Sequence, residues 1–184
     1  MSKTILILGG ARSGKSTHAE KLAKEIGGDS VLYVATAEAK DEEMKTRIKK
    51  HQSDRPNSWS TLESPTKIGE GIQEIWDLHK VILLDCLTLL VSNLLLLGAG
   101  EEGEPIDVNK IQEIVLEEIR DFSDTVLKLD TTVIIVSNEV GLGLVPPYEL
   151  GRVYRDVLGR ANQQIASWAN EVYFLAAGIP MRMK

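Results

Sequence analysis

Short apolar runs alternate with segments of helical spacing along most of the chain. Five runs rich in isoleucine, valine and leucine lie at residues 4–8 (TILIL), 30–35 (SVLYVA), 80–85 (KVILLD), 131–137 (TTVIIVS) and 171–177 (EVYFLAA). Such runs are typical of strands that are covered on both faces. Between them the pattern predicts helices over residues 16–26, 41–51, 66–78, 87–97, 108–129 and 150–168. The alternation predicts an α/β fold with a mostly parallel, doubly wound sheet and right-handed crossovers.

The chain is most simply one domain over residues 1–184 with a single core. The acidic, glycine-rich segment 98–107 is interpreted as a solvated connection between two helices, not a domain boundary. The most apolar stretch, residues 83–98, is interrupted by Asp85, Ser92 and Asn93. It falls short of the roughly 18 uninterrupted apolar residues of a membrane span. We therefore expect a buried strand followed by a buried helix, and no membrane span.

Composition and charge limit which classes of binding partner and which cellular compartment we expect for this protein. Hydrophobic residues make up 43% and charged residues 26%, and the net charge of −6 provides no basic surface for nucleic acid. The single cysteine, Cys86, excludes an internal disulfide, and the first residues, MSKTILILGG, have no features of a signal peptide. A cytoplasmic protein without generalised nucleic-acid binding is expected.

The stretch LILGGARSGKST carries the clearest chemistry, because it matches G-x-x-x-x-G-K-[ST] directly after a predicted strand and at the start of a predicted helix. Its glycines let successive backbone N–H groups converge on an anion, and the helix N-terminus adds a positive dipole. Lys15 is expected to reach the β and γ phosphates, and the Ser16 hydroxyl to bind Mg²⁺. The alternative is a glycine-rich turn that matches by chance, but the position favours a nucleotide site. Its predicted residues are Gly9, Gly10, Ala11, Arg12, Ser13, Gly14, Lys15 and Ser16.

Asp85 ends the apolar strand KVILLD and is expected to hold Mg²⁺ directly or through water. The alternative is an aspartate that caps the helix beginning at Leu87.

Polar residues also follow two other predicted strands, where a parallel sheet collects its ligands. Thr36, Asn138 and Glu139 are placed there, although turn formation explains Asn138 equally well. Neither stretch contains the Asn-Lys-x-Asp signature of switch-type GTPases, so an enzyme is favoured over a switch.

Two further patterns leave alternatives open. His51 shares a helix face with Met44 and Ile48, which by itself indicates a half-buried histidine at a helix terminus. Arg152, Asp156 and Arg160 recur at four-residue intervals. They are interpreted as a solvated ion-pair row, with binding of a second, anionic substrate as the alternative.

Taken together, the motifs resemble the bifunctional adenosylcobinamide kinase / adenosylcobinamide-phosphate guanylyltransferase family of cobalamin biosynthesis. The matching stretches are GGARSGKS, YVATAEAKDEEMKTRIKKHQSDRPNSWSTLE, LLDCLTLLVSNLL, SNEVGLGLVP and GRVYRDVLGRANQQIA with EVYFLAAGIP, in family order from Leu6 to the C-terminus. The resemblance implies a three-layer, RecA-like P-loop NTPase fold and a homotrimer. It also implies two reactions that use ATP or GTP, Mg²⁺ and adenosylcobinamide.

The resemblance assigns His51, in the pattern R-I-x-x-H-x-x-x-R-P, as the nucleophile that carries GMP between GTP and adenosylcobinamide phosphate. Phosphorylation targets the γ-phosphorus and guanylyl transfer the α-phosphorus. The nucleotide must therefore rebind, or the helix bearing His51 must move. Further guanine-nucleotide contacts are implied at Ala35, Thr36, Ala37, Gln52, Ser53, Asp54, Arg55, Glu63 and Asp85.

Two rival functions remain at this stage: a P-loop kinase for another small metabolite, with His51 structural, and a RecA-like regulatory ATPase. Glu63 has its own alternative as an exposed loop acid.

Overall fold

The computed structural model describes residues 3–38, 42, 45–46, 55–77, 79–100 and 105–184. These residues contain a seven-stranded sheet with the order β3-β2-β4-β5-β1-β6-β7. Neighbouring strands are parallel, except that β7 runs antiparallel to β6. The strands are β1 (Thr4–Gly9), β2 (Val31–Ala35), β3 (Ser60–Glu63), β4 (Val81–Asp85), β5 (Thr132–Asn138), β6 (Glu171–Ala176) and β7 (Ile179–Arg182).

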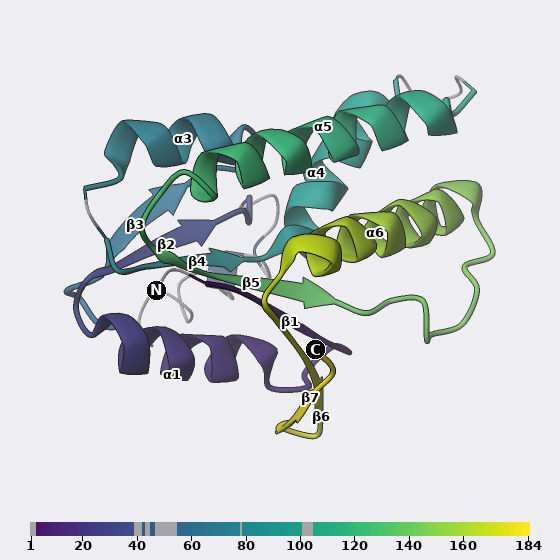
Figure 1. The fold of residues 1–184 in the computed structure, drawn as a ribbon. Helices are drawn as coiled ribbons and strands as arrows, with labels where there is room; N and C mark the ends of the chain where they lie inside the picture. Colours follow the sequence, from purple (N-terminus) through teal and green to yellow (C-terminus); the bar gives the residue numbers. More distant parts are fainter. Residues whose placement is uncertain (1–2, 39–41, 43–44, 47–54, 78, 101–104) are drawn as a thin grey trace.

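Helices cover both faces of this sheet (Figure 1). The helix α1 (Lys15–Gly27) lies on one face, and the other described helices lie on the opposite face. These are α3 (Ile68–Ile75), α4 (Leu87–Gly98), α5 (Val108–Val126) and α6 (Glu149–Trp168). The predicted mostly parallel, three-layer α/β architecture is confirmed.

Alternation along each strand divides the core into two layers. In β1, Ile5 and Ile7 pack with Ala19 and Ala23 of α1, whereas Leu6 joins the cluster formed with the helices of the other face. All three strand side chains are fully buried. Residues that alternate in a strand point to opposite faces, so an uninterrupted apolar run is what a sheet covered on both sides requires.

Two strands lie outside the sequence prediction. β3 is an edge strand in which only Leu62 is half-buried, and every residue of β7 is exposed. Neither has an apolar run, because neither is covered on both faces. Their positions follow from pairing with β2 and β6.

The helix predicted over residues 66–78 is shorter in the structure, ending at Ile75 before the extended backbone of Trp76. It begins after Lys67, which has a left-handed φ of 54°, because the Glu118 carboxylate accepts the backbone N–H groups of Lys67 and Ile68. Of the helix predicted over residues 41–51, the structure describes Glu42, Lys45 and Thr46, which are helical. The remainder of that prediction lies outside the described residues.

The apolar stretch at residues 83–98 forms the end of β4 and all of α4, as predicted. Leu87, Leu90, Val91 and Leu94 of α4 are buried in the core, while Leu96 and Leu97 are exposed at its C-terminal end. In the described part of the chain, no helix combines the length and apolar character needed to cross a bilayer.

Candidate nucleotide site

The carboxyl ends of five neighbouring strands gather the predicted site residues in one row. Ala35 of β2 pairs with Glu63 of β3 on one side and with Asp85 of β4 on the other. Farther along the sheet, Gly9 of β1 pairs with Asn138 of β5. Parallel strands place their carboxyl ends on the same edge of a sheet, and that edge is where open α/β sheets bind ligands.

The loop from Gly9 to Ser16 connects β1 to α1 at this edge. It turns through positive φ angles of 155° at Gly9, 56° at Arg12 and 91° at Gly14, and Gly14 is the N-cap of α1. The β6–β7 turn holds this loop in place, because the backbone N–H of Gly178 in that turn donates to the Ser13 carbonyl at 2.9 Å. This geometry turns backbone donors and a helix N-terminus toward one point, which is the arrangement that binds phosphate.

Gly9 is required sterically as well as conformationally. A Cβ at this position would lie 2.5 Å from the Leu175 carbonyl oxygen and 2.7 Å from Ser13 Oγ. We expect Gly9→Ala to lower the free energy of unfolding by about 2 kcal/mol or more. Chemical denaturation of the purified variant measures this loss.

Gly10 provides the matched control, since a Cβ there meets nothing within 4 Å. Gly10→Ala is expected to change the free energy of unfolding by less than about 0.5 kcal/mol. Equal stabilities of the two variants would contradict the assignment of Gly9 as the tight point of the loop.

Lys15 lies in the first turn of α1 with only 7% of its surface exposed. Its ammonium group donates to the Gly10 carbonyl at 2.6 Å and lies 3.5 Å from Ser13 Oγ. The charge is therefore held inside the loop that would receive the phosphates. An ammonium group has three donors, so Nζ can bind a phosphoryl oxygen in addition to the Gly10 carbonyl.

Asp85 is held by a buried tyrosine on the adjacent strand. The Tyr33 hydroxyl donates to Asp85 Oδ2 at 2.9 Å. Burial first, and then the negative charge of Asp85, raise the pKa of Tyr33 far above its usual value, so the phenol remains a donor. The helix-cap alternative for Asp85 is wrong, because α4 has Cys86 as its N-cap and no side-chain cap hydrogen bond.

Cys86 follows Asp85 and is the one cysteine of the chain. Burial, and secondarily the charge of Asp85, raise the pKa of its thiol to about 11. The thiol is therefore protonated at neutral pH and is no competitor for the role of nucleophile.

Thr36 joins the ends of β2 and β4. Its hydroxyl donates to the Cys86 carbonyl at 2.7 Å and accepts from the Cys86 N–H at 3.0 Å. Asn93 of α4 donates to the Thr36 carbonyl. With its side chain fully buried, Thr36 fixes the geometry of the site edge, and its contact with a nucleotide stays a prediction.

Arg55 lies over the ring of Tyr33, with its guanidinium carbon 3.4 Å from the ring centroid. Its Nε is buried without a hydrogen-bond partner. The family resemblance assigns Arg55 to the site, and the structure puts it on the same face of the sheet as Asp85. A guanidinium at this place is suited to bind an anionic group of a nucleotide.

The remaining predicted residues fall into two groups. Ala37 follows Thr36, and Glu63 ends β3 beside Ala35, at the same edge as the loop. His51, Gln52, Ser53 and Asp54 lie outside the described residues.

The polar residues Asn138 and Glu139 lie where β5 ends and a turn begins. Glu139 Oε1 accepts the Gly141 N–H at 2.8 Å, and the Glu139 N–H donates to the Gly9 carbonyl. The Asn138 backbone is held by Thr88 and Asn162. The turn interpretation therefore accounts for Glu139, whereas Asn138 is the last residue of β5 and pairs with Gly9 of β1. The Glu139 backbone joins the end of β5 to the phosphate loop.

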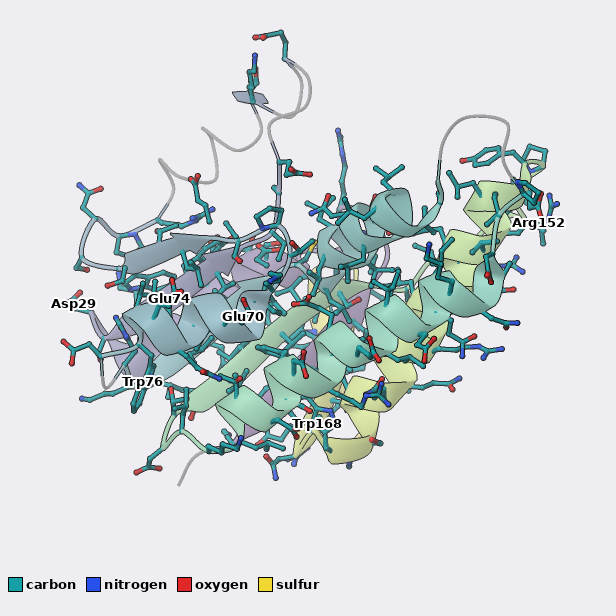
Figure 2. The ribbon with its side chains drawn as sticks, turned by 90° about the horizontal axis from the view of Figure 1, so that it is seen from above. Asp29, Glu70, Glu74, Trp76, Arg152 and Trp168 are labelled. Carbon is teal, nitrogen blue, oxygen red and sulfur yellow. The ribbon has the colours of Figure 1, made fainter. Side chains whose placement is uncertain are left out.

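The arginine row on α6 is not an ion-pair row. Arg152, at the end of the molecule labelled in Figure 2, donates to the carbonyls of Pro146 and Pro147. Arg160 donates to Gln112 of α5, and Asp156 contacts Arg155. Each arginine has a structural partner, which favours neither the ion-pair row nor a shared anion site.

Tyr33 is the site residue that the sequence analysis does not identify. Its signal is a single aromatic hydroxyl in an aliphatic strand, two residues before that strand reaches the ligand edge. The contact of the β6–β7 turn with the loop has no comparable signal, because it depends on how β6 pairs with β1.

Comparison with known proteins concerns the chain as a whole. A family model described as cobinamide kinase / cobinamide phosphate guanyltransferase matches residues 5–183. The bifunctional adenosylcobalamin biosynthesis protein CobU of Escherichia coli is 41% identical over 98% of this chain and 99% of its own length. The corresponding protein CobP of Pseudomonas aeruginosa is 43% identical over 97% of this chain and 96% of its own length.

A likeness to a solved structure concerns the fold alone. One solved structure, described as an ATPase domain, has a TM-score of 0.50 and 17% identity, and the match covers 94% of this chain and 68% of that one. The predicted RecA-like P-loop fold is confirmed.

Proposed function

Because the chain belongs to the cobinamide kinase / cobinamide phosphate guanyltransferase family, we propose that it carries out two successive reactions in cobalamin biosynthesis. In the first, a nucleoside triphosphate phosphorylates the hydroxyl of the aminopropanol arm of adenosylcobinamide. In the second, GTP transfers GMP to that phosphate, which gives adenosylcobinamide-GDP and pyrophosphate. The enzyme is therefore a bifunctional transferase.

One observation carries the proposal: a phosphate loop and a strand-end carboxylate occupy the same edge of the sheet. The loop contributes backbone donors, the Lys15 ammonium and the Ser16 hydroxyl, and β4 contributes Asp85. Phosphoryl and nucleotidyl transfer both need negative charge on phosphoryl oxygens to be met at fixed positions. A preformed array of donors supplies this without reorganisation.

In the kinase step, the substrate hydroxyl oxygen forms a bond to the γ-phosphorus and its proton is released to solvent. The bond to the bridging β–γ oxygen breaks, so that a nucleoside diphosphate leaves. Lys15 and the loop N–H groups meet the charge on the transferring phosphoryl group.

In the guanylyl step, an imidazole nitrogen of His51 forms a bond to the α-phosphorus of GTP and pyrophosphate leaves. A phosphate oxygen of adenosylcobinamide phosphate then attacks the same phosphorus and frees the histidine. His51 lies outside the described residues, so this role is supported by resemblance and by Arg55, four positions later, which lies at the site edge over Tyr33.

Mg²⁺ fits the chemistry of the residues present. Asp85 Oδ2 accepts from Tyr33, and the carboxylate ends β4 at the same edge of the sheet as the loop, with β5 between β4 and β1. Ser16 adds a hydroxyl in the first turn of α1. The described residues hold no cluster of three or more His, Cys, Asp or Glu side chains suited to a metal. That pattern matches Mg²⁺ bound through one carboxylate, one hydroxyl and substrate phosphates. When bound, the ion supplies neutralisation of phosphate charge.

We also propose that the enzyme is a cytoplasmic homotrimer, as its family resemblance implies. The exposed Leu96 and Leu97 at the end of α4 provide an apolar surface for such an assembly.

The proposal is tested by following the corrinoid itself. Purified protein is incubated with adenosylcobinamide, Mg²⁺ and ATP, then with GTP, and the corrinoid is analysed by mass spectrometry. We expect the gain of one phosphoryl group, followed by the gain of one GMP unit. Gain of phosphate without GMP would indicate a kinase alone, and nucleotide hydrolysis with an unchanged corrinoid would indicate a regulatory ATPase.

A further inference from the structure

Tyr33 occupies an unusual position between two side chains of opposite charge. It is 2% exposed and lies in the core layer shared with α1, yet it contacts Asp85 through its hydroxyl and Arg55 through its ring. Burial alone does not require a tyrosine at this position, because aliphatic side chains fill the neighbouring buried positions of β2.

The contact with Asp85 follows from strand register. Tyr33 pairs with Leu83 and Ala35 pairs with Asp85, so Asp85 lies one pleat beyond Tyr33 on the same face of the sheet. The hydroxyl donates to Oδ2 at 2.9 Å. This hydrogen bond restricts the rotation of the carboxylate and engages Oδ2, so Oδ1 is the oxygen that the tyrosine does not engage.

The contact with Arg55 fixes a residue near the end of the long connection between β2 and β3. The guanidinium stacks on the ring at 3.4 Å, and the residues after it are anchored where the Trp59 N–H donates to the Pro56 carbonyl and the Trp59 indole to the Gly28 carbonyl. Within the part of the chain that the structure describes, Arg55 has no ion pair and its buried Nε has no hydrogen bond. Among the described residues, the tyrosine ring is therefore the side-chain contact of this cation, and it places the guanidinium beside the site.

The ring also keeps the two charges apart. Arg55 and Asp85 both contact Tyr33, but no salt bridge joins them in the described structure. A direct ion pair would neutralise a carboxylate that is needed for a cation and a guanidinium that is needed for a phosphate.

We propose that Tyr33 is a positioning residue of the nucleotide site, which holds Asp85 for the divalent cation and Arg55 for the nucleotide while preventing the two from pairing. The inference rests on the proposed nucleotide-binding function. It assigns the two parts of Tyr33 different effects. The hydroxyl affects the binding of the divalent cation through Asp85, and the ring affects the binding of the nucleotide through Arg55.

The test separates these effects by measuring GTP binding by titration calorimetry at a series of Mg²⁺ concentrations. Tyr33→Phe keeps the ring and removes the hydrogen bond to Asp85. We expect it to raise the Mg²⁺ concentration for half-maximal GTP binding roughly tenfold, with near-normal affinity at saturating Mg²⁺. Tyr33→Leu removes the ring as well, and is expected to weaken GTP binding about tenfold even at saturating Mg²⁺.

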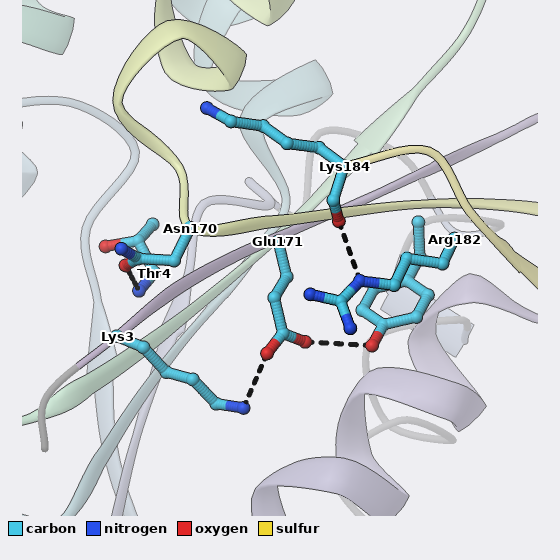
Figure 3. Close-up of polar contacts among 7 residues, drawn as sticks. Lys3, Thr4, Asn170, Glu171, Arg182 and Lys184 are labelled. Atoms are coloured by element: carbon cyan, nitrogen blue, oxygen red, sulfur yellow. Dashed lines mark hydrogen bonds and ion pairs between the residues drawn. The ribbon is translucent and has the colours of Figure 1, made fainter.

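Tyr173→Phe is the matched control, because it removes another tyrosine–carboxylate hydrogen bond. The Tyr173 hydroxyl donates at 2.8 Å to Glu171, which also pairs with Lys3 in a cluster that includes Arg182 and Lys184 (Figure 3). Glu171 is the first residue of β6, so it lies at the amino ends of the parallel strands, whereas the phosphate loop lies at their carboxyl ends. Wild-type Mg²⁺ dependence is expected for this variant.

A double-mutant cycle distinguishes positioning from a general packing effect. At saturating Mg²⁺, where loss of the hydroxyl has little effect, Tyr33→Leu in the Arg55→Ala background should cause no further loss of GTP affinity, because the ring no longer has a cation to hold. Additive losses, or a wild-type Mg²⁺ response of Tyr33→Phe, would overturn the inference. If the Leu variant fails to fold, Tyr33→Phe alone decides. Absence of GTP binding by the wild-type protein would instead refute the proposed function.

Discussion

Replacing His51 by alanine is expected to abolish guanylyl transfer while leaving the phosphorylation of adenosylcobinamide in place. The imidazole forms the covalent bond to GMP, so its removal lowers the rate of guanylyl transfer on the order of a thousandfold or more. The kinase step uses the phosphate loop and not the histidine. With GTP labelled in the α-phosphate, wild-type protein should form an acid-labile adduct that the variant lacks.

His79→Ala is the matched histidine control. His79 precedes β4, at the end of that strand away from Asp85, and its ring contacts Ser60 Oγ and accepts the Asp77 N–H. This variant should form the adduct normally. An adduct that survives in His51→Ala would exclude His51 as the nucleophile, and a parallel loss of kinase activity would show that the substitution acts through the fold.

Replacing Lys15 by glutamine is expected to impair both reactions together. Its ammonium group belongs to the loop that holds the triphosphate for either transfer, so both rates should fall on the order of a hundredfold to a thousandfold. Separate assays of γ-phosphoryl transfer and α-label transfer measure the two losses. The joint loss distinguishes Lys15 from His51, whose replacement affects one reaction only.

Lys21→Gln, on the exposed side of α1 where Lys21 pairs with Glu25, is the control for a lost lysine charge. It should leave both rates unchanged, since an exposed pair at this spacing contributes little. Because Lys15 Nζ also contacts the Gly10 carbonyl, the stability of Lys15→Gln is measured in parallel. A folded Lys15→Gln protein with normal rates would contradict the phosphate role of the loop.

The sequence predicts the parts of this fold that are governed by burial and by local backbone demands. The five long apolar runs form β1, β2, β4, β5 and β6. The first four are almost wholly buried between the helices of the two faces (Figure 1), whereas β6, next to the exposed β7, is buried only at Val172 and Leu175. The phosphate loop can equally be predicted from the sequence, since Gly9 and Gly14 have the positive φ angles that only glycine adopts easily. The short edge strand β3 and the exposed hairpin strand β7 escape prediction, because their pairing depends on neighbouring strands and not on their own composition.

The candidate site is only partly visible in the sequence. Asp85 is identified from its place after an apolar strand, but the Tyr33 hydroxyl that orients it becomes evident only when β2 and β4 are aligned in register. Likewise, Arg55 reaches Tyr33 from a connection whose course no periodicity reveals. His51 is assigned by resemblance, because an isolated histidine on a helix has no pattern that separates a nucleophile from a half-buried side chain.

The most direct test of the central claim is a calorimetric titration of GTP into the purified protein, with and without Mg²⁺. Phosphates gathered by the loop amides, Lys15, Ser16 and Asp85 should give saturable binding that Mg²⁺ strengthens. If neither GTP nor ATP binds in the presence of Mg²⁺, the loop is no triphosphate site and the account is wrong.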